Sequence, residues 1–400
     1  MLNAAEPRTV KVPGGKSSLK LSDITEEASR LADFADHEQV WLGRDEARGL
    51  TAIVAVHDTT LGPALGGTRV WPHETFEAAL TDALRLSHGM TLKAAVAGLA
   101  LGGGKAVIVA DARSDKTPEL LDAYAEMLAA LEGQYITAED VGLSLADADY
   151  LRARTPNVTG TTRGGSGNPS PVTAQGVFLG IKAALKHKTG SEKLDGVRVA
   201  VQGLGAVGWS LAKRLRNEGA RLSVTDIDPA RAEKAVAHLD AVALEGDAIV
   251  TADVDVFAPC ALGAVLSETT IPLLKAGIVA GSANNQLATP QDAERLRARG
   301  ILYAPDYVIN AGGLINVAEE LTPPGYDAEA AMKRVRVIPR TLGAIFRRAE
   351  AEGRTTDAVA EAIALEHIER ARAKKARRTK AVRLSRLLFT EPQTGSNGLS

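Results

Sequence analysis

The chain has 400 residues, of which 45% are hydrophobic and 24% are charged, and its formal net charge is −2. This length is too great for one compact core and predicts two domains. The near-neutral charge argues against nucleic acid as the main partner, and no apolar run reaches the length of a membrane span.

Cysteine and histidine usage narrows the class further. A single cysteine, Cys260, excludes an intramolecular disulfide framework and any multi-cysteine metal site. The seven histidines show no zinc-type spacing, so we expect no metal. Residues 1–20 are polar, contain two prolines and two adjacent glycines, and lack the apolar core of a secretory signal. We expect a cytoplasmic protein whose residues 1–20 form a flexible extension.

The first third of the chain predicts alternating helices and strands. Helical spacing of apolar residues predicts helices over residues 23–36, 75–96 and 118–131, and apolar runs predict strands over residues 40–42, 50–57, 106–110 and 135–138. A glycine-rich stretch from Gly62 to Arg69 lies between a strand and the long helix that carries Lys93. It is either a simple turn or one wall of a ligand cleft.

Three consecutive glycines, Gly102 to Gly104, separate the long helix from the strand that follows Lys105. We expect a turn here, because glycine adopts positive φ angles and lets the backbone approach a ligand. In a poorly hydrated cleft, mutual repulsion and desolvation would lower the pKa of Lys93 or Lys105, so that one acts as a base while the other binds an anion. The alternative is a glycine-rich turn with one solvated lysine.

Asp140 follows the strand expected over residues 135–138. A carboxylate at a strand's end is typical of active sites in α/β folds, but it could equally cap a helix that begins near Leu143. Residues 157–171 are rich in Gly, Ser, Thr, Asn and Pro and predict an interdomain hinge. A helix should start after Pro171, with Thr173 either capping it or facing the cleft.

A dinucleotide motif occupies residues 197–226. A strand leads into Gly203-Leu-Gly205-Ala-Val-Gly208, a helix to about residue 218, and a second strand that ends at Asp226. The first glycine should make the turn, the second should admit the pyrophosphate, and the third should let helix and strand pack closely. Asp226 can hydrogen-bond the ribose diol and disfavours a 2′-phosphate, so NAD is preferred over NADP. A glycine-rich turn without a nucleotide is the alternative.

The rest of the chain predicts further strands over residues 254–257 and 277–280, a last strand near residue 303, and helices over residues 328–352 and 356–372. Loops after these strands should line the carboxyl edge of a parallel sheet. Cys260 lies in one of them and is expected to be a small packing residue rather than a nucleophile. The basic run over residues 370–386 is a solvated helix end or tail, or else a contact for nucleic acid or another subunit.

Together these features suggest hydride transfer from an amino-bearing carbon to NAD. A lysine suits the α-carboxylate of the substrate, a second lysine of low pKa can activate water, and a carboxylate can shuttle the amine proton. A 2-hydroxy-acid dehydrogenase would more naturally supply a histidine or a lysine that acts on an alcohol, and no isolated histidine has an obvious place in this cleft.

An ordered set of motifs resembles the Glu/Leu/Phe/Val family of amino-acid dehydrogenases, closest to its leucine, valine and phenylalanine branch. The likeness spans roughly residues 40–366 and rests on Gly66-Gly-Thr-Arg69, Met90-Thr-Leu-Lys93, Leu101-Gly-Gly-Gly-Lys105, Thr137-Ala-Glu-Asp140, Ser166-Gly-Asn-Pro-Ser-Pro-Val-Thr173, Ala258-Pro-Cys-Ala-Leu-Gly263, Gly281-Ser-Ala-Asn-Asn285 and Tyr303-Ala-Pro-Asp306-Tyr. It implies oxidative deamination of an L-amino acid to the 2-oxo acid with NAD, releasing ammonia.

The resemblance also implies roles for individual residues. Lys105 and Asp140 match the catalytic lysine and aspartate, and Lys93 matches the lysine that binds the α-carboxylate. The other expected substrate contacts are Gly66, Gly67, Met90, Asn284, Asn285 and the side-chain pocket residues Leu65, Ala138, Leu314 and Val317. The expected nucleotide contacts are Arg69, Thr173, Gly203, Gly205, Ala206, Val207, Gly208, Asp226, Ile227, Cys260, Ala261 and Asn284.

The predicted fold is therefore α/β with two domains. Residues 21–155 plus 330–375 should form a substrate domain of the dimerisation type, and residues 156–329 a doubly wound Rossmann NAD-binding domain. The C-terminal helices should return to the first domain, and residues 376–400 should form a basic, disordered tail. The family implies a homo-oligomer, a dimer or an octamer, with a cleft that closes.

Branched-chain substrates are favoured over phenylalanine, although the residues at the pocket positions resemble different branches of the family. Ala138 resembles the leucine branch and Leu314 the phenylalanine branch, while residues 166–173 look most like leucine enzymes. An alternative from a different class is a non-catalytic regulatory protein that binds NAD. Such a protein would not need to retain Lys93, Lys105 and Asp140 together.

Overall fold

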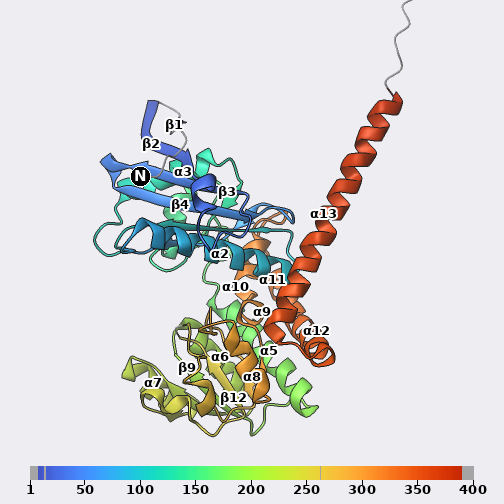
Figure 1. Cartoon of the computed structure of the whole chain (residues 1–400). Coiled ribbons are helices and arrows are strands. Elements are labelled where there is room, and N and C mark those ends of the chain that lie inside the picture. Colours follow the sequence, from blue (N-terminus) through green and yellow to red (C-terminus); the bar gives the residue numbers. More distant parts are fainter. Residues whose placement is uncertain (1–7, 13–14, 262, 390–400) are drawn as a thin grey trace, which may run out of the picture.

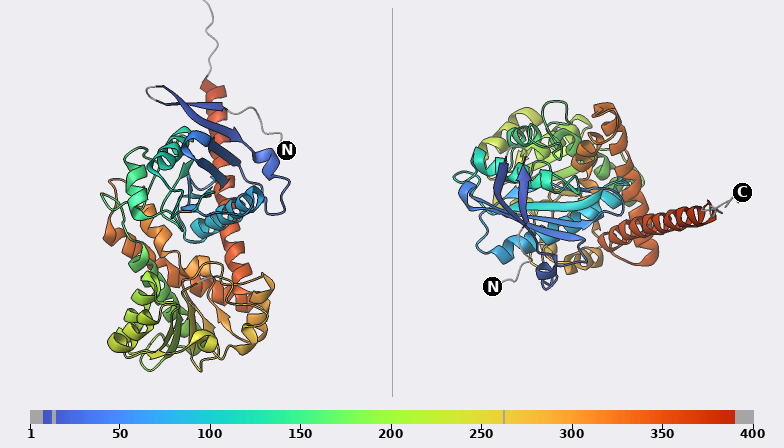
Figure 2. Two further views of the ribbon diagram at one scale, coloured as in Figure 1. Left: turned by 90° about the vertical axis from the view of Figure 1, so that its left-hand side faces the viewer. Right: turned by 90° about the horizontal axis from the view of Figure 1, so that it is seen from above.

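The computed structural model describes residues 8–12, 15–261 and 263–389. These residues form two lobes, each built around one β-sheet, with a long C-terminal helix beside them (Figure 1). Figure 2 shows the lobes stacked end to end and the last helix projecting past the N-terminal lobe. No helix within the described ranges is both long enough and apolar enough to cross a membrane.

The N-terminal lobe contains an eight-stranded sheet in the order β1-β2-β3-β4-β7-β5-β8, with β6 paired to β7. Its strands are β1 (Arg8–Val12), β2 (Gly15–Asp23), β3 (Gln39–Asp45), β4 (Leu50–Asp58), β5 (Ala64–Leu65), β6 (Thr68–Val70), β7 (Gly102–Ile108) and β8 (Tyr135–Ile136). β4 pairs antiparallel with β7, whereas β5 and β6 pair parallel with it. β7 is therefore an interior strand, and all of its residues are buried.

Two helices cover opposite faces of this sheet. α2 (Phe76–Val96) packs with Val107, whereas α3 (Pro118–Ala130) packs with Ala106 and Ile108. Successive side chains of a strand point to opposite faces, so Lys105 lies on the same side of β7 as Val107, which is the side of α2. Sheet geometry thus directs Lys105 toward the helix that carries Lys93.

The glycines Gly102 to Gly104 belong to β7, so the expected turn is wrong. None of the three has a positive φ; that geometry occurs earlier, at Gly98, where φ is 67° after the end of α2. A Cβ on Gly102 or Gly103 would overlap the backbone of Asp58 or Thr91, and a Cβ on Gly104 would lie 2.7 Å from the ring of Tyr135. The glycines permit close packing around β7, which periodicity cannot reveal because the neighbours are distant in sequence.

The N-terminal predictions also need correction. Residues 8–12 and 15–23 form β1 and β2, which pair antiparallel at the edge of the sheet, instead of a flexible extension. Residues 1–7 and 13–14 of the expected extension lie outside the described residues. The helix expected over residues 23–36 is only α1 (Thr25–Ala28), because turns follow it and still place Leu31 and Phe34 against the core.

The second lobe contains a six-stranded parallel sheet in the order β11-β10-β9-β12-β13-β14. Its strands are β9 (Arg198–Gln202), β10 (Arg221–Thr225), β11 (Val242–Ala243), β12 (Val256–Pro259), β13 (Ile278–Val279) and β14 (Leu302–Tyr303). Numbered along the chain, this order is 3-2-1-4-5-6, the order of a doubly wound dinucleotide-binding sheet. The predicted Rossmann fold is confirmed.

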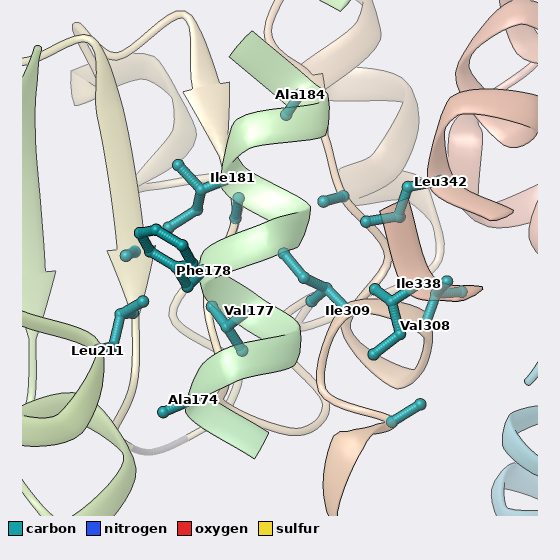
Figure 3. Packing of buried hydrophobic residues seen from close by; sticks show 14 of the residues in the cluster. Ala174, Val177, Phe178, Ile181, Ala184, Leu211, Val308, Ile309, Ile338 and Leu342 are labelled. Carbon is teal, nitrogen blue, oxygen red and sulfur yellow. The ribbon is translucent and has the colours of Figure 1, made fainter. Parts of the chain in front are cut away.

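The remaining helices cover this sheet, connect the lobes, or, like α4 and α13, pack on the first lobe. They are α4 (Leu145–Arg152), α5 (Ser170–Thr189), α6 (Ala206–Asn217), α7 (Pro229–Leu239), α8 (Gln291–Ala298), α9 (Asp306–Ile309), α10 (Gly312–Glu319), α11 (Ala328–Val335), α12 (Val337–Glu352) and α13 (Thr356–Phe389). Short 3-10 helices occupy Glu46–Arg48, Gly246–Ile249 and Ile271–Leu273. α5 packs between Leu211 of α6 and Ile338 and Leu342 of α12 (Figure 3).

The C-terminal helices divide between the two lobes. α13 packs against α2, as the predicted return to the first domain requires, but α12 packs against α5 of the second lobe. Residues 337–352 therefore contact α5 of the second lobe as well as α13, and the helix expected over residues 328–352 is broken at Arg336 into α11 and α12. Residues 376–389 continue α13 rather than forming a disordered tail, and residues 390–400 lie outside the described residues.

A pair of glycine substitutions tests the packing around β7. Gly103→Ala should lower the free energy of unfolding by about 1–3 kcal/mol, because its methyl group would overlap the backbone of Thr91. Gly89→Ala, inside α2 where an added methyl meets nothing within 4 Å, should instead raise it by about 0.5–1 kcal/mol. Urea unfolding of both variants measures the difference, and equal stabilities would contradict the proposed packing.

Candidate active site

A cavity of about 290 Å³ lies where the two lobes meet. The first lobe contributes the β5–β6 connection, one face of α2, Lys105 of β7 and the segment after β8; the second contributes Asn284, Asn285 and residues of α9 and α10. The sequence-predicted residues in its lining are Leu65, Gly66, Gly67, Arg69, Met90, Lys93, Lys105, Ala138, Asp140, Asn284, Asn285, Leu314 and Val317. The structure thus brings together residues that are far apart in sequence.

Lys105 and Asp140 form an ion pair at this cavity. The Lys105 ammonium donates to Oδ2 of Asp140, and Lys105 is only 6% exposed. Burial raises the pKa of Asp140, but the positive charges of Lys105 and Arg69 outweigh it, so the pKa lies below its usual value. Asp140 does not cap a helix, because the N-cap of α4 is Ser144. The alternative of a plain capping residue is therefore excluded.

Two glycines let the backbone close around this pair. A Cβ on Gly66 would overlap the carbonyl oxygen of Gly104, and a Cβ on Gly67 would lie 2.8 Å from Cβ of Asp140. The stretch from Gly62 to Arg69 is consequently a wall of the cleft rather than a simple turn, and it contains the short strands β5 and β6.

Lys93 faces the same cavity without a partner. Its ammonium makes no ion pair or hydrogen bond with any residue that the structure describes, although its backbone carbonyl accepts from the amide of Ala97 at the end of α2. Burial lowers the pKa of Lys93 to about 8; the negative charge of Asp306 opposes this shift, and the Lys105 ammonium adds to it. The lowered lysine pKa expected in the cleft occurs at Lys93. An unpaired cation in a poorly hydrated cavity favours an anionic ligand.

Arg69, expected among the nucleotide contacts, belongs to this cavity. Its guanidinium donates to both carboxylate oxygens of Asp82, at 2.9 and 3.1 Å, and its Nε lies 4.0 Å from Oδ2 of Asp140. That Nε is buried without a hydrogen-bond partner. Arg69 thus adds positive charge near Asp140.

Apolar side chains form one wall of the cavity. Leu65, Ala138, Leu314 and Val317 are all buried and line it. Leu314 and Val317 lie on α10, three residues apart, and therefore share one helix face. The wall joins residues from both lobes, so its width depends on how the lobes are held relative to each other.

Asn284 is held by a neighbour in the second lobe. Its Oδ1 accepts a hydrogen bond of 2.7 Å from Nδ2 of Asn310, which leaves its own amide group as a donor at the cavity. Asn285 has a φ of 51°, an uncommon value for a residue other than glycine. Both residues remain candidates for holding an anionic group beside Lys93.

Sequence reasoning missed Asp306 as a site residue. Asp306 begins α9, lines the cavity, and accepts a hydrogen bond of 2.8 Å from the backbone amide of Gln286. Burial raises the pKa of Asp306, and the Lys93 ammonium acts against the shift. A signal was available, because Asp306 stands within the quoted motif Tyr303-Ala-Pro-Asp-Tyr. Lys93, whose charge acts on Asp306, lies more than two hundred residues earlier, so spacing in the sequence could not link the two residues.

The glycine-rich loop after β9 fits a dinucleotide. Gly203 has a φ of 97°, and a Cβ on Gly208 would overlap the carbonyl oxygen of Gly203, as a tight turn and close helix packing require. A Cβ on Gly205, by contrast, would meet nothing within 4 Å. Gly205 is the N-cap of α6 and supplies no side-chain cap, so the first amides of α6, at Ala206 and Val207, face this open space.

The other expected nucleotide contacts lie around this loop, and they differ in how exposed they are. Asp226, at the end of β10, accepts a hydrogen bond of 2.6 Å from the Leu204 amide and so braces the loop, while Ile227 beside it is fully exposed. Cys260 and Ala261 pack against Gly203. Burial raises the pKa of the Cys260 thiol, which agrees with a packing role.

Thr173 does not cap α5, because the helix already begins at Ser170. Its hydroxyl donates to the carbonyl oxygen of Pro169 at 3.0 Å, and it lies against Gly313, where a Cβ would come within 2.8 Å of Oγ1. Thr173 therefore sits at the junction of α5 and α10, outside the lining of the cavity.

Comparisons with known proteins agree with this geometry. Residues 37–157 match the family model of the Glu/Leu/Phe/Val dehydrogenase dimerisation domain, and residues 164–230 and 224–377 match that of Glutamate/Leucine/Phenylalanine/Valine dehydrogenase. Leucine dehydrogenase of Bacillus subtilis is 50% identical over 339 residues, which cover 84% of this chain and 93% of that protein.

Two crystal structures share the two-lobed fold. L-tryptophan dehydrogenase from Nostoc punctiforme matches with a TM-score of 0.75 and 47% identity, over 84% of this chain and 97% of that one. Hetero-hexameric glutamate dehydrogenase from Thermus thermophilus, in a leucine-bound form, matches with a TM-score of 0.70 and 25% identity, over 87% and 94% of the two chains.

Two glycine substitutions test the dinucleotide loop. Gly205→Ala should keep the melting temperature of the wild type but weaken NADH binding about tenfold or more, because its methyl group fills space that only a ligand would occupy. Gly208→Ala should instead lower the melting temperature, since its methyl group would overlap Gly203. Fluorescence titration with NADH and thermal unfolding distinguish the two effects. Unchanged NADH affinity in Gly205→Ala would show that the nucleotide binds elsewhere.

Proposed function

The chain belongs to the Glu/Leu/Phe/Val dehydrogenase family, and we propose that it oxidatively deaminates leucine, valine and isoleucine to their 2-oxo acids, with NAD as the hydride acceptor and with release of ammonia. It is an oxidoreductase that acts on CH–NH₂ donors, and its reaction is reversible. The observation that carries the proposal is the single cavity in which Lys93, the Lys105–Asp140 pair and an apolar wall face one another.

The cavity suggests an orientation for the substrate. The α-carboxylate binds Lys93, which lacks another partner, with the amide of Asn284 or Asn285 as a second donor. The side chain lies against Leu65, Ala138, Leu314 and Val317. These contacts place the amino-bearing carbon toward Lys105 and Asp140. Gly66 and Gly67 let the backbone pack closely beside this pair, and Met90 of α2 adds to the lining.

Lys105 and Asp140 then move the protons. NAD, held at the loop from Gly203 to Gly208, would supply the hydride acceptor for Cα when it is bound; with the substrate amine in its neutral form, oxidation of Cα gives an iminium on the substrate. With Lys105 in its neutral form, water adds to this carbon and gives a proton to Lys105. This proton then passes through Asp140 to the nitrogen of the substrate. Lys105, neutral again, takes the proton of the new hydroxyl group as the C–N bond breaks. The 2-oxo acid forms and ammonia leaves. The observed ion pair supports this relay, because the two groups already share a hydrogen bond.

NAD is proposed over NADP because Asp226 ends β10. A carboxylate there accepts from the ribose diol and repels a 2′-phosphate. The amides of Ala206 and Val207 and the space beside Gly205 suit the pyrophosphate, and exposed Ile227 suits the adenine face. Arg231 lies 3.7 Å from Asp226, so the preference is best tested with both cofactors.

We also propose a homo-oligomer, a dimer or an octamer. The match of residues 37–157 to a dimerisation domain supports this, as does the hexameric assembly named for the Thermus thermophilus relative. A cytoplasmic location remains a prediction from the sequence. Phenylalanine remains the second candidate substrate, because Leu314 resembles that branch of the family.

A substrate panel tests the proposed function. NADH formation at alkaline pH should be fastest with leucine, valine or isoleucine, slower with phenylalanine, and weaker with NADP than with NAD. Lys105→Ala should lose about 10²–10⁴ of the rate while still binding NADH, because only the proton relay is removed. NADH binding without turnover of any amino acid would instead favour the regulatory protein.

The pH dependence of carboxylate binding tests the role of Lys93. The dissociation constant of 4-methylpentanoate, which has no amine to titrate, should rise about tenfold per pH unit above pH 8, because protonated Lys93 is lost as the pH passes its pKa of about 8. In Lys93→Arg the guanidinium stays charged, so the dissociation constant should be level between pH 8 and 10. Calorimetric titration measures both. The same slope in the arginine variant would assign the titration to another group.

A further inference from the structure

Glu320 holds the predicted hinge through two backbone amides. It follows α10 directly, and its Oε1 accepts hydrogen bonds from the amides of Gly160, at 2.8 Å, and Ser166, at 2.7 Å. Both amides belong to the segment over residues 157–171 that runs between the lobes. Hydrogen bonds to a charged carboxylate are roughly twice as strong as those between neutral groups. One side chain of the second lobe therefore fixes two points of the connection.

The first of these points lies directly behind the substrate pocket. Gly160 has a φ of 75°, and a Cβ at this position would lie 3.8 Å from Cβ of Ala138 and 3.8 Å from Cγ1 of Val317. Ala138 comes from the first lobe and Val317 from α10 of the second, and both line the cavity. The Gly160 backbone thus lies beside residues from both halves of the apolar wall, and the carboxylate of Glu320 holds that backbone in place.

The hinge segment is anchored separately to the first lobe. The Thr159 amide donates to the carbonyl oxygen of Thr137 at 2.8 Å, and Asp149 of α4 accepts from the amide and hydroxyl of Thr162 at 2.8 and 2.5 Å. On the other side, Asn316 of α10 donates to the Ser166 carbonyl oxygen at 3.4 Å, a long bond. Glu320 is therefore the strongest side-chain link between this segment and α10 within the described residues.

The beginning of α10 is held differently, by close packing on α5. A Cβ on Gly312 would lie 2.5 Å from the carbonyl oxygen of Val172, and a Cβ on Gly313 would lie 2.8 Å from Oγ1 of Thr173. α10 is thus fixed to α5 at its start and to the hinge at its end. Leu314 and Val317 lie between these two attachments.

We propose that Glu320 is a positioning residue that sets the separation between Ala138 and the face of α10, and thereby the size of substrate side chain that the cavity accepts. Glu320 does not line the cavity and touches no substrate; it acts through Gly160 and Ser166. This inference rests on the proposed function, because selectivity among apolar amino acids is the property that it explains.

Three variants test the proposal. In Glu320→Ala, the ratio of kcat/KM for leucine to that for phenylalanine should fall at least tenfold, mainly through KM, because the wall can widen. Glu320→Gln should stay within threefold of the wild-type ratio, since its amide oxygen can accept the same two hydrogen bonds. The control is Glu319→Ala, which removes a buried carboxylate that pairs with Arg334 at 3.0 Å on α11, away from the hinge. It should leave the ratio unchanged.

Hydrogen exchange separates this proposal from the proposed function. Peptides that cover residues 157–171 should exchange at least tenfold faster in Glu320→Ala than in the wild type, but not in Glu320→Gln or Glu319→Ala. If the wild type does not turn over any amino acid, the proposed function is wrong. The exchange rates of the hinge peptides would then still test whether Glu320 holds the hinge. A Glu320→Ala variant with wild-type selectivity, or with unchanged exchange in the hinge, would overturn the positioning role even if its melting temperature falls.

Discussion

The ion pair between Lys105 and Asp140 is the interaction on which the site depends. It joins an interior strand of the first sheet to the segment after β8, and the backbone around it is packed so closely that Gly66, Gly67 and Gly104 have no room for a side chain. A buried pair of this kind contributes little net stability, because desolvation offsets much of the attraction. Its value lies in fixing an amine and an acid side by side, which is the arrangement that proton relay requires.

The pair also decides how the neighbouring charges behave. Asp140 is already hydrogen-bonded to Lys105 and lies near Arg69, so the Lys93 ammonium feels only the longer-range attraction of Asp306 and, more weakly, of Asp140. Lys93 is therefore a cation that a substrate carboxylate can complete. The second lobe supplies the rest of the cavity and, beyond it, a nucleotide loop whose middle glycine faces open space. Function consequently requires the two lobes to keep a fixed relative position, and the hinge contacts of Glu320 contribute to it.

Local patterns in the sequence were enough to predict much of this arrangement. The dinucleotide motif was recognisable because its strand, glycines, helix and acid are adjacent in the chain, and the parallel sheet has the expected order. The ordered motifs also placed Lys93, Lys105 and Asp140 in one cleft.

The glycines of β7 were misread as a turn, since their tight neighbours, Asp58, Thr91 and Tyr135, come from three other elements. Asp306 and Glu320 were missed for the same reason: each acts on a partner more than one hundred and fifty residues away. The packing of α12 on α5 was not expected, because an apolar helix face does not reveal which helix it will contact.

The central claim concerns the placement of an amino acid between the two lysines and the acid. A crystal structure of the protein with NAD and 4-methylpentanoate tests it most directly, since this acid retains the carboxylate and side chain of leucine but cannot react. We expect its carboxylate on Lys93, its C2 carbon facing Lys105 and Asp140, and its methyl groups against Ala138 and Val317. A carboxylate bound away from Lys93, or a ligand lying outside the cavity between the lobes, would contradict the account.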